Sequence, residues 1–390
     1  YKLRDWIFSR QRYWGEPIPL VQCDNEEFYP MPEEELPLTL PEVESYKPTG
    51  TGQSPLANEE EWVNAPCPAD PSKPGKRETN TMPQWAGSCW YYLRYLDPKN
   101  DRELASREKI DYWMPVDLYV GGAEHAVLHL LYARFWHKVL YDVGVVNSDE
   151  PFMRLVNQGM ILGEGGVKMS KSLGNVINPD DIVRDFGADS MRVYEMFMGP
   201  LRQEKPWSTN GLVGVHRFLD RVWRLSERPM LETEPPKELL RVLHKTIKKV
   251  GEDTGDLSFN TAISQMMIFT NELFRVDENY RALWEPFVRI LTPYAPHVGE
   301  ELWEKLGNPP PVSLAEWPQY NEELTKDEEL EIVLQVNGKV RAKVMLPAGL
   351  SRDELQEHAL SHDRIQEWVQ GKEVRKVVAV PDKLVNVVVG

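Results

Sequence analysis

The sequence has 390 residues, of which 41% are hydrophobic and 27% are charged, and its formal net charge is −16. These values are typical of a water-soluble globular protein with two or three domains. They argue against a membrane protein, because no run of eighteen apolar residues occurs.

The amino-terminal segment Tyr1–Gly15 is charged and aromatic and does not begin with methionine. It does not resemble a signal peptide. We therefore expect the chain to be a fragment, a processed chain or one subunit of a split enzyme.

The three cysteines, Cys23, Cys67 and Cys89, are few, odd in number and never in a Cys-x-x-Cys pair. This pattern argues against a disulfide framework and indicates a reducing, cytoplasmic location. Cys67–Asp70 resembles half of a zinc knuckle that lacks its second thiol, so no structural zinc is expected.

Residues 1–200 are predicted to be mixed α/β, with an irregular insertion at residues 24–80, which are rich in Pro, Glu and Asn. The apolar run Val116–Gly122 predicts a strand, and Ala123–Tyr141 has the apolar spacing of a helix. A strand, a glycine turn and a helix make a βα unit, whose ligands lie at the carboxyl end of the strand.

A second βα unit is predicted next, with a buried strand at Leu155–Leu162 and a glycine-rich loop at Gly163–Gly174. The following helix should begin with Asn178 as N-cap and Pro179 as first residue, and should end at Gly187. Another helical stretch is predicted at Asp189–Met198.

Residues 201–326 are predicted to form a helical bundle after a linker at Pro200–Ser208. Its helices are expected at Val215–Ser226, Lys237–Glu252, Asn260–Arg275 and Ala282–Leu306, the last interrupted by prolines. Basic residues outnumber acidic ones between Arg202 and Lys249. Such a stretch can contact phosphates or can be an ordinary solvated helix surface.

Residues 327–390 are predicted to form a small α+β domain. Apolar and polar residues alternate between Ile332 and Val344, which is the strand period, and Asn337-Gly338 predicts a hairpin turn. A two-residue loop would break the alternation, whereas a three-residue loop with a bulge would keep it.

The strongest chemical signal is Lys168-Met169-Ser170-Lys171-Ser172, which lies in the glycine-rich loop. Two lysines three residues apart on a mobile loop can close over a polyphosphate. They would stabilise the charge that develops on leaving pyrophosphate more than they stabilise the ground state. A basic loop without this wording is usually only solvent-exposed.

These five residues match the KMSKS signature of class I aminoacyl-tRNA synthetases. Arg4–Pro19 resembles the subgroup for leucine, isoleucine and valine, and three more segments resemble the bacterial type of leucyl-tRNA synthetases: Ser88–Tyr95, Gly121–Phe135 and Val336–Val344. The resemblance runs along the whole chain. It implies the second half of a Rossmann-type catalytic domain, then an anticodon-stem-binding bundle and a tRNA-contacting α+β domain.

The resemblance implies ATP-dependent ligation of leucine to its tRNA through leucyl-adenylate, with Mg²⁺ entering with the ATP. Lys168 and Lys171 are the implied catalytic residues. The implied ATP-binding residues are these two lysines together with Met169, Ser170, Ser172, Gly121, Gly122, Glu124, His125 and Gln158. The implied leucine-binding residues are Trp85, Tyr91, Tyr119 and His129. Core packing is the simpler alternative for the aromatic residues and the histidines.

The sequence also departs from the family pattern. It holds no His-x-Gly-His, and the editing domain is missing. In the family, a second signature, His-Ile-Gly-His (HIGH) or a close variant, lies near the start of the catalytic domain. We therefore expect the chain to need a HIGH-bearing amino-terminal half, in cis or as a separate subunit. Leu173 follows the signature where a basic residue is common. The alternatives are an inactive tRNA-binding module and a fragment of an isoleucyl or valyl enzyme.

Overall fold

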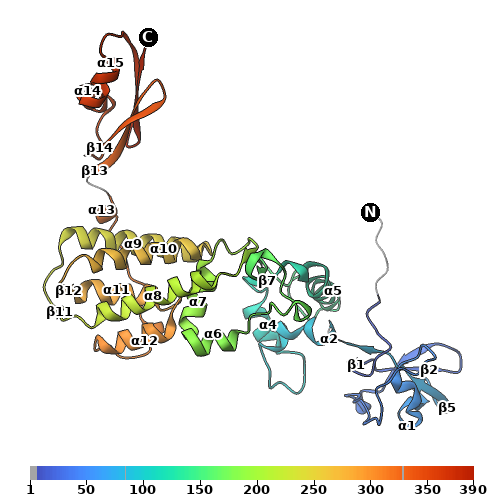
Figure 1. The fold of residues 1–390 in the computed structure, drawn as a ribbon. Coiled ribbons are helices and arrows are strands. Elements are labelled where there is room, and N and C mark those ends of the chain that lie inside the picture. Colours follow the sequence, from blue (N-terminus) through green and yellow to red (C-terminus); the bar gives the residue numbers. More distant parts are fainter. Residues whose placement is uncertain (1–6, 84, 327–328) are drawn as a thin grey trace. The chain divides into compact units, whose positions relative to one another are not determined.

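The computed structural model describes residues 7–83, 85–326 and 329–390, and only the backbone of Trp85 and Glu329. The chain divides into two compact units, Tyr1–Met160 and Ile161–Gly390. Figure 1 labels most of their helices and strands. Both combine helices and strands, as the predicted fold class requires. No helix in the described part is both long and apolar enough to cross a membrane.

The insertion predicted to be irregular contains an antiparallel sheet of four strands in the order β3-β2-β5-β4. The strands are β2 (Leu20–Cys23), β3 (Phe28–Pro30), β4 (Asn64–Cys67) and β5 (Asp70–Arg77). The two ends of the insertion come together where β1 (Glu16–Pro17) pairs with β6 (Thr81–Met82). The prediction of an irregular insertion is therefore wrong for the strands, which are too short and too rich in Pro and charge to show a period in the sequence.

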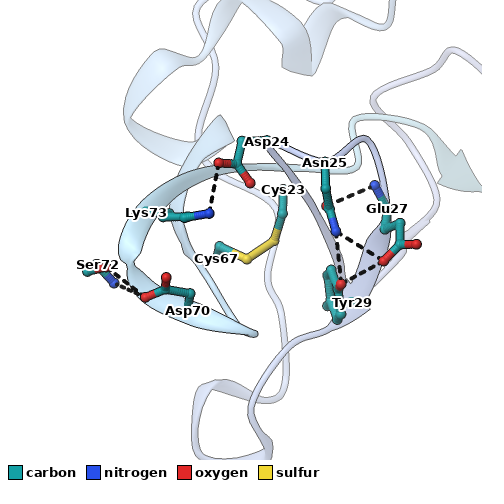
Figure 2. Close-up of a disulfide and its surroundings, with 9 residues drawn as sticks. All are labelled: Cys23, Asp24, Asn25, Glu27, Tyr29, Cys67, Asp70, Ser72 and Lys73. Carbon is teal, nitrogen blue, oxygen red and sulfur yellow. Dashed lines mark hydrogen bonds and ion pairs between the residues drawn. A yellow bond between two sulfur atoms is a disulfide. The ribbon is translucent and has the colours of Figure 1, made fainter.

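Cys23 and Cys67 form a disulfide within this sheet, with Cα atoms 5.4 Å apart (Figure 2). They end β2 and β4, the two strands that flank β5, and both side chains are buried. The prediction of unpaired cysteines is wrong for this pair, because sheet register brings together residues that are 44 positions apart. It also removes the argument for a reducing compartment. Cys89 is buried and free.

A parallel pair of strands, β7 (Tyr119–Gly122) and β8 (Leu155–Gln158), lies beside helix α5 (His129–Asp142) in the first unit. Smaller helices complete this part of the unit: α2 (Trp85–Ser88), α3 (Tyr91–Arg94) and α4 (Arg107–Trp113). The predicted strand Leu155–Leu162 is interrupted, because β9 (Ile161–Leu162) pairs elsewhere, with β10 (Lys205–Pro206). β8 is also only partly buried.

The helix predicted at Ala123–Tyr141 is interrupted as well. A 3₁₀ turn covers Ala123–Val127, and Leu128 has φ −121° and ψ −109° before α5 begins. Leu131, Phe135 and Val139, which have the apolar spacing of a helix, are about half exposed. Helical spacing thus identified an amphipathic helix correctly but not its starting residue.

The helix after the glycine-rich loop begins as predicted. In α6 (Pro179–Phe186) the Asn178 side chain accepts a hydrogen bond from the Asp180 N–H, and Gly187 follows the last turn with φ 85°. Helix α7 (Ala188–Phe197) then packs against the bundle. Both ends of α6 are set by local sequence, which is why they could be predicted.

The bundle consists of α8 (Thr209–Ser226), α9 (Lys237–Gly255), α10 (Phe259–Phe274), α11 (Arg281–Leu291) and α12 (Pro296–Lys305). The large side chains Phe269, Trp284 and Phe287 are fully buried at its centre. Pro286 lies inside α11, and the break between the last two helices falls just before Pro296.

The carboxyl-terminal sheet has the strand order β14-β13-β16-β15 and packs against α14 (Arg352–Ser361) and α15 (Asp363–Val369). Its strands are β13 (Glu329–Val336), β14 (Lys339–Pro347), β15 (Val374–Val380) and β16 (Leu384–Val389). Asn337 and Gly338 both have positive φ, so the turn has two residues. A register shift beside Leu334 and Gln335 then restores the alternation, and Val340 is exposed rather than on the core face.

Candidate functional site

Three aromatic side chains predicted to contact leucine meet in the first unit. The hydroxyl oxygens of Tyr91 and Tyr119 lie 3.1 Å apart, and the ring of His129 lies 5.9 and 6.0 Å from their ring centroids. They come from α3, β7 and the first residue of α5. Together they form an aromatic wall in which the two tyrosine hydroxyls are in contact. The side chain of Trp85, the fourth predicted member, lies outside the described part of the structure.

His129 is the most unusual member of this group. Its side chain is only 8% exposed, and neither ring nitrogen has a hydrogen-bond partner in the described structure. Burial, with a smaller contribution from nearby His125, lowers the pKa of His129, so the ring is neutral near pH 7. A buried polar group without a partner is costly and is expected to meet a ligand or water.

The residues predicted to bind the adenylate gather at the carboxyl end of β7. Gly122 pairs with Gln158 of β8, and a side chain at Gly122 would meet the Glu124 carboxylate at less than 3 Å. The His125 ring lies 6.2 Å from that of His129 although the helix breaks between them. Gly121 pairs with Asn157. The predicted set is therefore brought together where parallel strands place ligands.

The KMSKS loop lies in the second unit. Lys168 and Lys171 are exposed, and among the described residues neither side chain has an ion pair or hydrogen bond. A 3₁₀ turn over Lys171–Leu173 begins at Ser170, whose hydroxyl accepts from the Leu173 N–H and lies 3.1 Å from that of Ser172. The Met169 side chain packs against the bundle core. The loop thus presents two free cations on an ordered turn.

Asn175 contacts the signature from outside it and was given no role from the sequence. Its side-chain oxygen accepts from the Ser170 N–H at 2.9 Å, and its amide nitrogen donates to the Lys168 carbonyl at 3.3 Å. A side chain at Gly163 would approach this amide nitrogen to 2.9 Å. Asn175 therefore closes the loop by bridging its two sides, and its position just after the signature is the only signal that the sequence offers.

Comparisons with known proteins agree with this picture. Residues 1–208 match the model of the family tRNA synthetases class I (I, L, M and V), and residues 236–356 match the anticodon-binding domain of tRNA ligase. Because the first match covers more than half of the chain, the chain belongs to the class I tRNA synthetases of the isoleucine, leucine, methionine and valine group.

Individual relatives narrow the likeness to leucine enzymes. The whole chain is 54% identical to the leucine–tRNA ligase of Borrelia hermsii and spans 50% of that protein. It also matches the solved agnB2 LeuRS of Agrobacterium radiobacter K84, in ternary complex with tRNA and LeuAMS, over the whole chain and 52% of that structure. The TM-score is 0.81 and the identity 34%. The chain thus spans about half the length of the relatives it matches.

Proposed function

We propose that this chain supplies the KMSKS half of the active site and the tRNA-binding domains of a leucine–tRNA ligase. The observation that carries the proposal is that one leucine-type sequence contains two features that this reaction needs. One is a wall of aromatic rings around an unpartnered neutral histidine, and the other is a loop that presents two free lysines. The 54% identity to a leucine–tRNA ligase over the whole chain supports the choice of amino acid.

In the proposed first step, leucine attacks the α-phosphate of ATP to give leucyl-adenylate and pyrophosphate. Lys168 and Lys171 would stabilise the negative charge that develops on the leaving pyrophosphate. Among the described residues no group of three His, Cys, Asp or Glu side chains could hold a metal ion. Mg²⁺ would arrive on the ATP phosphates, which is how it usually binds in such sites.

The first unit would hold leucine and adenosine. Tyr91 and Tyr119 would contact the leucine side chain, and the neutral ring of His129 avoids placing a buried charge against it. Glu124 would accept from ribose hydroxyls, and Gly121 and Gly122 would let the adenylate approach the backbone. His125 and Gln158 would contact the adenosine moiety.

The second step transfers leucine to the terminal ribose of the tRNA, so the chain must bind that RNA. Helix α9 carries Lys237, Lys245, Lys248 and Lys249, of which the last two form ion pairs with Glu322 and Asp253. In the carboxyl-terminal domain, Lys339 and Lys343 of β14 are exposed. The guanidinium carbon of Arg341 lies 3.4 Å from the centroid of the Trp368 ring. Such local basic surfaces can bind phosphates although the net charge is −16.

The other half of the ATP site would come from a HIGH-bearing segment, joined in cis or present as a separate subunit. The sequence has no His-x-Gly-His, and its relatives are about twice as long. We place the reaction in the cytoplasm, where tRNA charging supplies translation.

Leucine-dependent exchange of pyrophosphate into ATP tests the proposal. The isolated chain should show little exchange, and adding a HIGH-bearing half from a leucine enzyme should restore it. Exchange that depends on isoleucine or valine would contradict the leucine assignment. If the complemented chain still bound leucine tRNA but gave no exchange, it would instead be a tRNA-binding module.

A further inference from the structure

The entrance of the KMSKS loop is attached to the helical bundle. Strand β9, which leads into the loop, pairs with β10, which leads into α8, and the Trp207 N–H donates to the Leu162 carbonyl at 2.8 Å. Two segments about 45 residues apart in sequence thus run side by side. The segment that leads into the KMSKS loop is therefore held beside the segment that leads into α8, the first helix of the bundle.

Glu164 adds a side-chain contact at this base. Its Oε1 accepts from the Thr209 hydroxyl at 2.8 Å and from the Thr209 N–H at 3.4 Å. Thr209 is the first residue of α8, where backbone N–H groups lack helical partners and the helix dipole is positive. A carboxylate at this position is favourable for electrostatic reasons as well as for its hydrogen bonds.

Thr209 links this contact to the bundle core. Its hydroxyl oxygen accepts from the indole N–H of Trp207 at 3.3 Å, and the Trp207 side chain is buried. Glu164 is thus connected through one hydroxyl to a residue fixed by packing. The exposed Glu164 carboxylate is therefore bonded to a hydroxyl that also contacts the buried Trp207 side chain.

A pair of glycines follows Glu164 immediately. Gly165 and Gly166 have φ of 79° and 78°, a conformation that other residues adopt only with strain, although a Cβ atom at either position would meet nothing within 4 Å. The Gly163 N–H donates to the Val167 carbonyl at 2.8 Å and narrows the neck of the loop. The order along the chain is therefore the Glu164 contact, a tight glycine turn and then the lysine-bearing signature.

We propose that Glu164 is a positioning residue that fixes the base of the KMSKS loop to the amino terminus of α8. The helical bundle then sets the position from which the lysine-bearing signature is presented. Its consequence for catalysis rests on the proposed ligase function, whereas the attachment itself does not.

Hydrogen–deuterium exchange of the 390-residue chain, resolved over residues 163–175, tests the attachment. Glu164→Ala and Thr209→Val should each speed exchange of the hydrogen-bonded loop amides about three- to tenfold, the size expected for losing one ordinary hydrogen bond. Thr209→Ser retains the hydroxyl and should behave like the parent chain. Glu204→Ala, which removes a nearby exposed carboxylate with no such contact, is the matched control.

Melting temperature should stay within about 2 °C in all four variants, since surface changes have small effects on global stability. Unchanged loop exchange in both Glu164→Ala and Thr209→Val would overturn the proposal. Equal acceleration by Glu204→Ala would do the same.

A second measurement addresses catalysis in the chain complemented with a HIGH-bearing half. Glu164→Ala should lower kcat for pyrophosphate exchange about tenfold and leave KM for leucine unchanged, because the change affects the loop and not the leucine wall. A rise in KM for leucine with unchanged kcat would contradict a positioning role for the loop. If the parent enzyme shows no exchange, the ligase function fails, and the deuterium measurement alone decides the attachment.

Discussion

The hydroxyl oxygens of Tyr91 and Tyr119 lie 3.1 Å apart. The centroids of their rings lie 5.9 and 6.0 Å from the centroid of the His129 ring. One tyrosine comes from a helix and the other from a strand, so the pair joins two elements of the first unit. Burial raises the pKa of Tyr119 well above its usual range. The Tyr119 hydroxyl therefore stays protonated and can share a hydrogen bond with that of Tyr91.

Tyr119→Ala should raise KM for leucine about tenfold or more, because it removes one aromatic face of the proposed pocket. Tyr119→Phe retains the face, loses only the hydroxyl contact with Tyr91, and should change KM less than about threefold. Steady-state exchange at varied leucine concentration measures both. Equal effects of the two substitutions would show that the ring does not contact leucine.

Lys171→Ala should lower kcat for adenylate formation by about 10² to 10³, the loss found when one donor to a developing negative charge is removed. Lys168→Ala should act in the same direction. KM for leucine should stay unchanged in both. Lys171→Arg retains the charge and should recover part of kcat. Full kcat in both Lys171→Ala and Lys168→Ala would show that these lysines do not take part in adenylate formation.

Asn175→Ala should loosen the KMSKS loop, because it breaks both hydrogen bonds that bridge the loop at Ser170 and Lys168. The expected cost is about 1–2 kcal/mol of local stability, seen as faster amide exchange across residues 168–175. Asn175→Asp retains the acceptor for the Ser170 N–H and should have about half the effect. Exchange unchanged by Asn175→Ala would contradict the bridging role.

Reduction of the Cys23–Cys67 disulfide should destabilise the four-stranded sheet and leave the bundle unaffected. Closing a loop of this length contributes at most about 4 kcal/mol through the entropy of the unfolded chain. Exchange of the β2 and β5 amides, followed with and without excess thiol, measures the change. Cys67→Ser should resemble the reduced chain and respond no further to thiol. A parent chain unaffected by thiol would show that the bond does not form in solution.

Asp97 should make the first unit sensitive to acid. Hydrogen bonds from Lys109, Asn100 and the Ser106 N–H hold the pKa of its carboxyl well below its usual range. Because the folded pKa lies below the unfolded value of about 3.9, the stabilisation is present above pH 4 and is lost as pH falls towards the folded pKa. Asp97→Asn should make the free energy of unfolding vary less with pH between pH 5 and pH 2, as measured by denaturant titration at each pH. An unchanged slope would contradict this.

Features governed by neighbouring residues could be predicted from the sequence. The start of α6 at Asn178 and its end at Gly187 depend on local capping, and the KMSKS signature is a continuous word. The meeting of Tyr91, Tyr119 and His129 followed only from the family resemblance, and the structure brings the three together although the helix breaks at Leu128.

Contacts between distant positions could not be predicted. Cys23 and Cys67 pair because of sheet register, and Glu164 contacts Thr209 because β9 and β10 run side by side. Neither pair leaves a periodic trace in the sequence. Leu131 and Phe135 show another limit, since helical spacing indicates which residues share a face of α5 but not the exposure of that face, which is about half in the described chain.

Charging of leucine tRNA by the chain combined with a HIGH-bearing half tests the central claim most directly. Incorporation of labelled leucine into acid-precipitable leucine tRNA should be seen with the complemented parent chain. It should fall at least about 10²-fold with Lys171→Ala and be absent for isoleucine and valine tRNAs. Two folded halves that bind each other and leucine tRNA but transfer no leucine, or that charge an isoleucine or valine tRNA instead, would contradict the account.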